Sequence, residues 1–406
     1  MKKWTSLLAA ALLTLTLAAG CGKTPVTSTV VPDDTIVTTT TGTDATTTTE
    51  QADVTTTTTT AAATKKPTTA KQTTAKKPTT TAKNSTPATT TAAPVTTPTT
   101  QPKAKTKVRI TTIAGPTGVG MVNLMEGQDA GTTKNAYTFD LVSDPTQAVS
   151  AISGGSTDIA AVPTNLASTL YNKTGGKVTI LAVNTLGVLH IMENGNTINS
   201  VADLKGKEIY TSGQGANPEY VLRYVLEKNG LDPDKDVTIH FVADNTALTA
   251  AVVTGQAAVA MVPEPVATSC RVQAKAKGLT VRMALDMTAE WDKVSNGSSQ
   301  LMMGCVIARR AFVEENPEAV KLFLAEYEAS IATVKADVDV AAALCEKYTV
   351  IPKAAVAKQA IPNCNLTFVA GSAMKEQLSG YLQVLYGYNP QAVGGKLPAG
   401  DFYYGS

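Results

Sequence analysis

The sequence predicts an α/β fold in two lobes for the part of the chain that begins at Lys107. From that residue onward, short apolar runs alternate with amphipathic runs, as strands and helices do when they follow one another along a chain. Most apolar runs are continuous rather than interrupted by polar residues, which is typical of strands covered by helices on both faces. The length that follows, about 300 residues, exceeds one typical core and therefore indicates two lobes.

The individual elements follow from these runs in chain order. Strands are expected at 107–113, 137–142, 158–162, 177–185, 188–193, 207–210, 237–242, 257–262 and 279–285. Helices are expected at 119–128, 145–155, 163–173 and 219–230, and again from Asn245 and from Pro263. The repeated order of strand, helix and strand predicts parallel sheets with right-handed crossovers. After residue 312 the pattern is almost entirely helical, with helices expected at 316–334, 338–348 and 372–387.

An internal repeat supports the division into two lobes. Residues 144–168 and 244–268 align without a gap, and they agree at an aspartate, a glycine and a proline among other positions: Asp144/Asp244, Gly155/Gly255 and Pro163/Pro263. Most of the other positions exchange similar residues. We expect the same unit of helix, strand and helix to occur once in each lobe.

The N-terminal pattern indicates an export signal. Lys2 and Lys3 precede an apolar stretch, Leu7–Ala19, that is too short to span a membrane comfortably. The stretch ends in "LAAGC", which resembles a bacterial lipobox and implies removal of residues 1–20 and lipid on Cys21. An ordinary secretory signal with a chance cysteine is the alternative. The lipoprotein interpretation places the chain on the outer face of the cell membrane.

The segment that follows, residues 21–106, is dominated by Thr with Ala, Pro and Lys. It holds almost no large apolar residues to offset the loss of chain entropy on folding, so we expect a disordered tether. The formal net charge of the chain is +2, and the excess of lysine lies mostly in this tether. That distribution argues against a nucleic-acid partner.

Four turns between an expected strand and an expected helix are candidates for holding a ligand. They are Ala114–Gly120, Val162–Asn165, Thr211–Ala216 and Val262–Pro265. In parallel α/β sheets, ligands bind beyond the C-terminal ends of strands, where helix N-termini supply free N–H groups. The third turn, "TSGQGA", lacks the lysine of a P-loop and the full GxGxxG pattern, so nucleotide binding is weakly supported.

Several stretches carry a resemblance to a known family. They are the lipobox, "AGPTG", "GSTDIAAVPTN", "SVADLKGKEIYTSGQGANPEYVLRYVLEKNGLDPDKDV" and "GQAAVAMVPEPVAT". Together they resemble the solute-binding proteins of ABC importers, in the nitrate/sulfonate/taurine and thiamine-precursor binding group, over almost all of residues 107–390. The resemblance implies a type II periplasmic-binding fold with mostly parallel sheets, a two-stranded hinge and a helical C-terminal part. Lobe 1 would comprise 107–192 and 304–406, and lobe 2 would comprise 193–303.

The resemblance also implies a function, partners and a site. The chain would capture a small organic solute between its lobes and, as a monomer, deliver it to an ABC permease with a cytoplasmic ATPase. The positions that match the family's ligand-lining turns are Pro116, Thr117, Gly118, Pro163, Thr164, Asn165, Ser212, Gly213, Gln214, Gly215, Ala216, Glu264 and Pro265. No catalytic residue, metal ligand or cofactor is expected among them.

Glu264 limits the choice of solute. A carboxylate in the cleft disfavours a small bare anion, and no arginine lies in the four turns to bind a sulfonate or nitrate. These features favour an amine-bearing or aminopyrimidine-like metabolite. The alternative is that Glu264 only caps the helix that follows it.

Two other functions stay open as alternatives, an enzyme on the same fold and a surface sensor or adhesion lipoprotein. Against the enzyme, His190 and His240 are the only histidines, no metal-binding spacing occurs, and no Ser or Cys has a His–Asp relay. Glu264 is the one candidate acid or base in the expected cleft.

The sequence allows two interpretations for several other residues. Four cysteines follow Cys21, namely Cys270, Cys305, Cys345 and Cys364, and they form either a bridge between Cys345 and Cys364 or buried thiols. Trp291, Met302 and Met303 line the cleft or pack in the core.

Overall fold

The computed structural model describes residues 104–406. The expected signal peptide (1–20), the lipidation site Cys21 and the tether up to residue 103 lie outside the described residues. All described residues belong to one compact unit. No helix within 104–406 is both long enough and apolar enough to cross a membrane.

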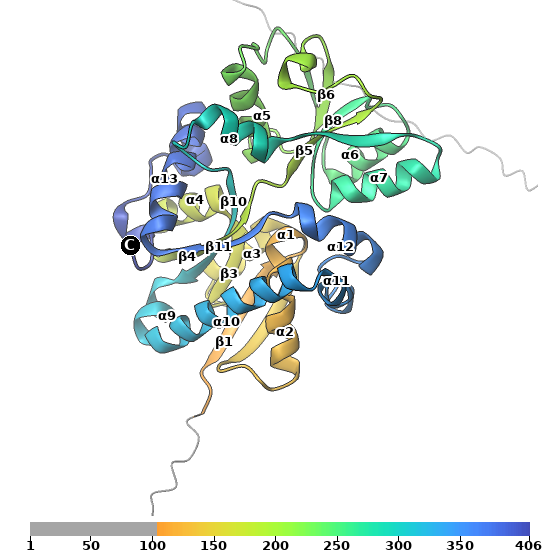
Figure 1. Ribbon diagram of the computed structural model, residues 1–406. Coiled ribbons are helices and arrows are strands. Elements are labelled where there is room, and N and C mark those ends of the chain that lie inside the picture. The colour runs from red at the N-terminus through yellow and green to blue at the C-terminus, as the bar shows by residue number, and fades with distance from the viewer. Residues whose placement is uncertain (1–103) are drawn as a thin grey trace, which may run out of the picture. The chain divides into compact units, whose positions relative to one another are not determined.

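Eleven strands of the described part form two sheets (Figure 1). The first sheet has the order β11-β4-β10-β3-β1-β2, with β1 Lys107–Ile113, β2 Ala136–Val142, β3 Ile159–Pro163, β4 Val178–Leu186, β10 Met302–Arg309 and β11 Leu366–Ala370. The second has the order β7-β6-β8-β5-β9, with β5 Leu189–Asn194, β6 Glu208–Thr211, β7 Thr238–Phe241, β8 Val259–Pro263 and β9 Val281–Asp286.

Helices connect and cover these strands. Their bounds are α1 Pro116–Val119, α2 Val122–Asp129, α3 Pro145–Ser153, α4 Thr164–Thr174, α5 Asn217–Lys228, α6 Asn245–Val253, α7 Val266–Ala276, α8 Met287–Ser295, α9 Arg310–Glu315, α10 Pro317–Ala336, α11 Val338–Lys347, α12 Ala354–Ala360 and α13 Gly371–Tyr388. Short 3₁₀ turns lie at η1 Val201–Leu204, η2 Ile361–Asn363, η3 Pro390–Val393 and η4 Gly400–Phe402. The expected helical C-terminal part is therefore present, but β11 interrupts it as a strand that the sequence pattern missed.

The first sheet is buried on both faces, as its apolar strands predicted. In β3, Ala160 and Val162 belong to one hydrophobic cluster, and Ile159 and Ala161 belong to another. The first cluster includes residues of α4 and α13, and the second includes residues of α2 and α10, which lies along the sheet (Figure 1). Neighbouring residues of one strand thus pack against different helices, which explains the continuous apolar run.

The expectation of mostly parallel sheets holds for only one part of each sheet. β1 runs parallel to β2 and β3, and β6 runs parallel to β7 and β8. β10 is antiparallel to β3 and β4, β11 is antiparallel to β4, and β5 is antiparallel to β8 and β9. β5 and β10 run against their neighbours because each enters its sheet from the other sheet, not through a crossover helix on the same sheet.

The chain passes between the two sheets twice, at residues 187–188 and again at 296–301. The crossings are closely packed: a Cβ atom on Gly187 would lie 2.2 Å from Thr288 Oγ1 and 2.5 Å from Leu301 Cδ2. The lobe bounds expected from the sequence stay a prediction. Their first division, after residue 192, falls within β5, which pairs only in the second sheet.

The internal repeat corresponds to one structural unit in each sheet. α3, β3 and α4 of the first sheet match α6, β8 and α7 of the second, and β3 and β8 are offset by one hundred residues (Ile159–Pro163 and Val259–Pro263). Asp144 and Asp244 make the same contact, because each accepts a hydrogen bond from the backbone N–H of the threonine two residues later. The expected repetition of helix, strand and helix is confirmed.

A shared aromatic core joins the two sheets on the side of α13. The Trp291 ring on α8 lies 4.2 Å from the Tyr224 ring on α5 and 5.5 Å from the Tyr381 ring on α13, measured between centroids. Trp291 and Tyr381 are fully buried, and the same hydrophobic cluster contains residues of both sheets. Trp291 therefore packs in the core, which settles one of the two readings left open by the sequence.

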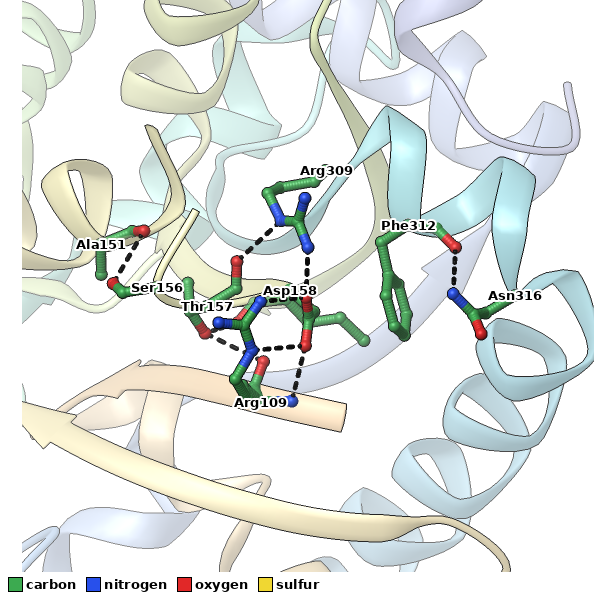
Figure 2. A network of polar contacts seen from close by, with 9 residues as sticks. Arg109, Ala151, Ser156, Thr157, Asp158, Arg309, Phe312 and Asn316 are labelled. Carbon is green, nitrogen blue, oxygen red and sulfur yellow. Dashed lines mark hydrogen bonds and ion pairs between the residues drawn. The ribbon is translucent and has the colours of Figure 1, made fainter. Parts of the chain in front are cut away.

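At the other end of the first sheet, a polar network fastens three strands (Figure 2). Asp158, directly before β3, accepts hydrogen bonds from Arg109 of β1 at 2.7 and 3.0 Å and from Arg309 of β10 at 2.5 Å. Burial alone would raise the pKa of Asp158, but the hydrogen bonds from the two arginines hold it below its ordinary value. The network lies at the opposite ends of β1 and β3 from the turns expected to bind ligand.

The four cysteines of the described part are free and buried, so the buried-thiol alternative is confirmed and a bridge between Cys345 and Cys364 is wrong. Both sulfur atoms lie in the apolar cluster beneath α11 and α12. Burial raises the pKa of the Cys345 thiol to about 12 and raises that of Cys364 as well, which disfavours the thiolate needed for disulfide exchange.

Candidate functional site

Turns from both sheets meet at one cavity of about 550 Å³. The turns that follow β1 and β3 of the first sheet and those that follow β6 and β8 of the second all contribute to its wall. The full lining is Ile113, Ala114, Gly115, Pro116, Thr117, Ser143, Pro145, Pro163, Asn165, Leu166, Thr185, Val188, Ala216, Asn217, Pro218, Asn245, Pro263, Glu264, Pro265, Val266, Met303, Gly304, Val350 and Pro352. A volume of this size suits a small organic ligand.

Seven of the thirteen site residues expected from the sequence lie in this wall, and at least one comes from each of the four turns. They are Pro116, Thr117, Pro163, Asn165, Ala216, Glu264 and Pro265. The other six, Gly118, Thr164, Ser212, Gly213, Gln214 and Gly215, do not line the cavity.

Two of these six serve the packing of the first sheet. A Cβ atom on Gly118 would lie 2.5 Å from the carbonyl oxygen of Ile113, so the position requires glycine for close approach of the backbone. Thr164 is fully buried, and its hydroxyl donates a hydrogen bond of 2.6 Å to the carbonyl oxygen of Met302. That bond fastens the start of α4 to β10.

The other four lie in the turn "TSGQGA", and two of them, Ser212 and Gly215, make hydrogen bonds to neighbouring residues of the same lobe. The Ser212 hydroxyl donates to Asn245 Oδ1 at 2.9 Å, and the Gly215 N–H donates to Glu219 Oε2 at 2.7 Å. Only Ala216, at the end of the turn, reaches the cavity. The turn therefore shapes the start of α5, and the helix itself forms the wall.

Several lining residues were missed by the sequence reading. Asn217 and Pro218 directly follow the quoted turn, and extending the turn by two residues would have included them. Pro145 and Asn245 follow the matched aspartates of the internal repeat, so their equivalence was available from the sequence. Val350 and Pro352 come from the loop between α11 and α12, and no local pattern marks them. Met303 lines the cavity, whereas Met302 is buried in the core.

The wall is largely apolar, and Glu264 is its only ionisable residue. Seven lining residues are prolines, which have no backbone N–H to donate. Polar recognition of a ligand therefore depends on a few side chains and on the N–H groups at helix N-termini. Neither histidine of the chain belongs to the wall: His190 is buried on β5, and His240 stacks on Tyr210 at 4.7 Å.

Glu264 is 2% exposed, and its carboxylate is already engaged within the protein. Oε1 accepts a hydrogen bond from the Thr268 hydroxyl at 2.9 Å, and Oε2 accepts one from the Thr268 backbone N–H at 3.2 Å. Asn363 Nδ2 donates a longer bond of 3.4 Å to Oε1. Burial raises the pKa of Glu264, and the hydrogen bonds from Thr268 partly oppose that rise.

The helix N-termini at the cavity differ in whether they are capped. Asp144 caps α3, Asp244 caps α6, and Glu264 binds the first turn of α7. By contrast, no side chain of the preceding N-cap residue binds the first turn of α4 or of α5. The first N–H groups of these two helices have no partner within their own helix, so they are the donors that a ligand can use.

No group of three or more His, Cys, Asp or Glu residues suited to a metal ion occurs within 104–406. The site as described offers shape, apolar surface, helix N-termini and uncharged polar side chains. These features are suited to holding a small organic molecule.

Comparison with known proteins identifies the family of the chain. The sequence model of one family, described as "ABC transporter, phosphonate, periplasmic substrate-binding protein", matches residues 132–343, which is more than half of the 406-residue chain. No curated protein sequence matches the chain.

Solved structures share the fold at low sequence identity. An ABC transporter from Parabacteroides distasonis aligns with a TM-score of 0.62 and 19% identity, over 74% of this chain and 99% of the other. The periplasmic aliphatic sulphonate binding protein SsuA from Escherichia coli aligns with a TM-score of 0.59 and 17% identity, over 74% and 92%. The alkanesulfonate-binding protein SsuA from Xanthomonas axonopodis pv. citri, bound to MOPS, aligns with a TM-score of 0.53 and 16% identity, over 73% and 96%. These likenesses confirm the predicted fold class.

Proposed function

The chain belongs to the family of phosphonate-type periplasmic substrate-binding proteins of ABC transporters, and on that premise we propose which solute it takes and how it delivers it. As a member of that family it is the substrate-binding component of an ABC transporter, and its partners are a permease and an ATPase. We propose that it binds one small organic solute in the cavity. We further propose that lipid on Cys21 anchors it, as a monomer, to the outer face of the cell membrane.

The observation that carries this proposal is the meeting of turns from both sheets at one cavity of about 550 Å³. A ligand there touches both sheets at once, so a form in which the sheets close around it binds more tightly than an open form. The permease then has a conformation to recognise that differs from the empty one.

The solute is organic rather than a bare inorganic ion. Most of the wall is apolar, and no lysine, arginine or histidine lies in it. Nitrate or sulfate would lose hydration there without gaining a cationic partner. The family description and the sulfonate-binding neighbours make organic phosphonates and sulfonates candidates, and for these the N-termini of α4 and α5 are the available donors.

Binding without catalysis is also part of the proposal. Glu264 is the only ionisable group in the wall, and both of its oxygens accept hydrogen bonds from Thr268. A catalytic acid or base has to reach the proton that it transfers, and this carboxylate faces its own helix. The enzyme alternative therefore has no free ionisable group in the cavity wall to act as acid or base.

Thermal unfolding of the full chain against a metabolite panel tests the function. The panel contains alkylphosphonates, alkylsulfonates, taurine, nitrate, aminopyrimidines, thiamine, riboflavin, amino acids and polyamines. A ligand at 100 times its Kd adds about 2.7 kcal/mol to the stability of the folded state, which raises the Tm measurably. A stabiliser recovered unchanged supports the proposal. A stabiliser recovered chemically altered favours an enzyme, and no shift with any compound favours a sensor or adhesion protein.

The anchor is tested separately. Cys21→Ser is expected to move the protein from the membrane fraction to the soluble exported fraction and to abolish incorporation of labelled palmitate. An unchanged membrane fraction and unchanged labelling would show that the "LAAGC" interpretation is wrong.

A further inference from the structure

Two asparagines in the cavity wall occupy corresponding places on opposite sheets. Asn165 is the second residue of α4, after β3 of the first sheet, and Asn217 is the first residue of α5, after β6 of the second. Both line the cavity. They are 8% and 5% exposed, respectively, so each is more than nine-tenths buried.

Neither carboxamide has a hydrogen-bond partner within residues 104–406. Asn217 Oδ1 is fully buried and has no hydrogen-bond partner. The Asn165 side chain is mostly buried, but its polar atoms are not among the fully buried atoms without a partner. The neighbouring Asn245 differs, because its Oδ1 accepts a hydrogen bond of 2.9 Å from the Ser212 hydroxyl and the residue is exposed. A buried polar group without a partner destabilises the folded state, so Asn217 in the cavity wall points to a partner that arrives with the ligand. Asn165 presents a second carboxamide to the same cavity from the other sheet.

Both asparagines stand beside free backbone donors. The N-cap residues of α4 and α5, Pro163 and Ala216, make no side-chain hydrogen bond to the first turn. Each helix start therefore offers backbone N–H donors next to a carboxamide that has one acceptor oxygen and two N–H donors. This holds whichever way the carboxamide is turned, because both of its ends are without a protein partner.

The chemistry of the solute follows from these two carboxamides and the backbone N–H groups beside them. A fully ionised sulfonate has only acceptors, so it would satisfy the N–H groups and leave both asparagine oxygens without a donor. A cationic amine has only donors and would leave the helix N–H groups unpaired. An uncharged group that carries a donor beside an acceptor, such as an amide or an aminated heteroaromatic ring, satisfies both.

We propose that Asn165 and Asn217 are the specificity-determining residues of the cavity and that each pairs with a donor–acceptor edge of an uncharged, amide-like solute, one from each sheet. This inference rests on the proposed function and narrows its ligand class. Because the two residues come from different sheets, both pairs form only when the sheets enclose the solute.

The test uses the full chain and probe pairs that differ only by exchange of NH₂ for CH₃. The pairs are benzamide with acetophenone, hexanamide with 2-heptanone, and 2-methylpyrimidin-4-amine with 2,4-dimethylpyrimidine; butanesulfonate serves as the acceptor-only anion. Titration calorimetry gives each Kd. We expect at least one NH₂ probe to bind about tenfold or more tightly than its CH₃ partner, since that partner leaves a buried oxygen unpaired.

Asn217→Leu and Asn165→Leu remove the carboxamides and keep the branched shape and the number of side-chain heavy atoms. Each is expected to reduce the preference for the NH₂ probe to about twofold or less. The Tm of the unliganded Asn217→Leu protein is expected to stay equal or to rise, because the unpartnered oxygen is gone. If Asn217→Leu loses ligand binding because it no longer folds, Asn217→Ser is measured instead. Serine keeps a polar side chain but is too short to reach the place of the carboxamide. Asn229→Leu, at the exposed C-terminal end of α5 and outside the cavity wall, is the matched control, and it should retain the preference.

The outcomes distinguish failure of the proposed role of the asparagines from failure of the proposed solute-binding function. Equal binding of the NH₂ and CH₃ probes, or a preference that survives both leucine variants, would overturn the role of the asparagines. Tight binding of butanesulfonate with no binding of any NH₂ probe would overturn the donor requirement and leave the binding function standing. Failure of these probes together with failure of the whole metabolite panel would contradict the proposed function itself.

Discussion

The Glu264 carboxylate accepts hydrogen bonds from both the backbone N–H and the hydroxyl of Thr268, so it caps α7 from a position two residues before the helix begins. The same carboxylate is the only ionisable group in the cavity wall. From the sequence, Glu264 had two readings, an amine-binding carboxylate and a helix cap. The geometry favours the second, because both oxygens already have donors.

Glu264→Gln should therefore have little effect on ligand affinity. The glutamine oxygen keeps one of the two bonds from Thr268, so we expect a change in Kd of about threefold or less for benzamide, measured by calorimetry. Glu264→Ala removes the cap and should lower the free energy of unfolding by about 1 kcal/mol. An amine-binding role requires the opposite result, namely a loss of more than about tenfold for putrescine in Glu264→Gln with unchanged stability.

Glu264 should also make stability depend on pH in a defined direction. Burial raises its pKa, so the folded state favours the protonated carboxyl. Stability from this group is fully present below its unfolded pKa of about 4.3 and is lost as pH rises through the higher folded value. We expect the Tm of the wild type to fall relative to that of Glu264→Gln between pH 4 and neutrality. Parallel Tm curves for the two proteins would show that Glu264 titrates as it does in the unfolded chain.

The sequence predicted those parts of the site that lie close to repeated or glycine-rich patterns. The repeat offset of one hundred residues placed Pro163 and Pro263 at corresponding strand ends, and both line the cavity. Patterns of this kind are local, because a strand, its turn and the next helix are contiguous in the chain. The four turns were therefore found, although only Ala216 of the third turn reaches the cavity.

The lining residues and the strand that the sequence did not predict depend on packing between segments that are distant in the chain. Val350 and Pro352 reach the cavity from the loop after α11, which no strand–helix turn marks. β11 is five residues long between helices, and its pairing with β4 depends on a strand nearly two hundred residues earlier. Asn217 has a helix-start pattern like many others, and only its burial without a partner distinguishes it.

Gly187, at the first crossing between the sheets, is expected to be intolerant of a side chain. A Cβ atom there would lie 2.2 Å from Thr288 Oγ1 and 2.5 Å from Leu301 Cδ2. Gly187→Ala should lower the free energy of unfolding by about 1–3 kcal/mol, because the second crossing has to shift. Gly387→Ala is the control: it lies within α13 with no atom inside 4 Å, so it should stabilise the protein by about 0.5–1 kcal/mol. Urea denaturation measures both, and equal stability of the two variants would contradict the crowding argument.

Asp158 should contribute to stability without contributing to binding. It is 4% exposed and joins Arg109 to Arg309 (Figure 2). None of these three residues lines the cavity. Asp158→Asn leaves two arginines side by side without their shared carboxylate. Since both arginines can turn partly into solvent, we expect a loss of about 2 kcal/mol in the free energy of unfolding.

The pH dependence of the same network has the opposite sign to that of Glu264. The arginines hold the pKa of Asp158 below its ordinary value of about 3.9, so its contribution is present above that value and is lost as pH falls through the lower folded one. The destabilisation by Asp158→Asn should therefore shrink in acid. Asp140→Asn, at an exposed site on β2, is the control and should leave the free energy of unfolding at neutral pH unchanged. A change of more than about twofold in the Kd of benzamide for Asp158→Asn would show that this end of the sheet is coupled to the cavity, because a purely structural fastening leaves the cavity wall unchanged.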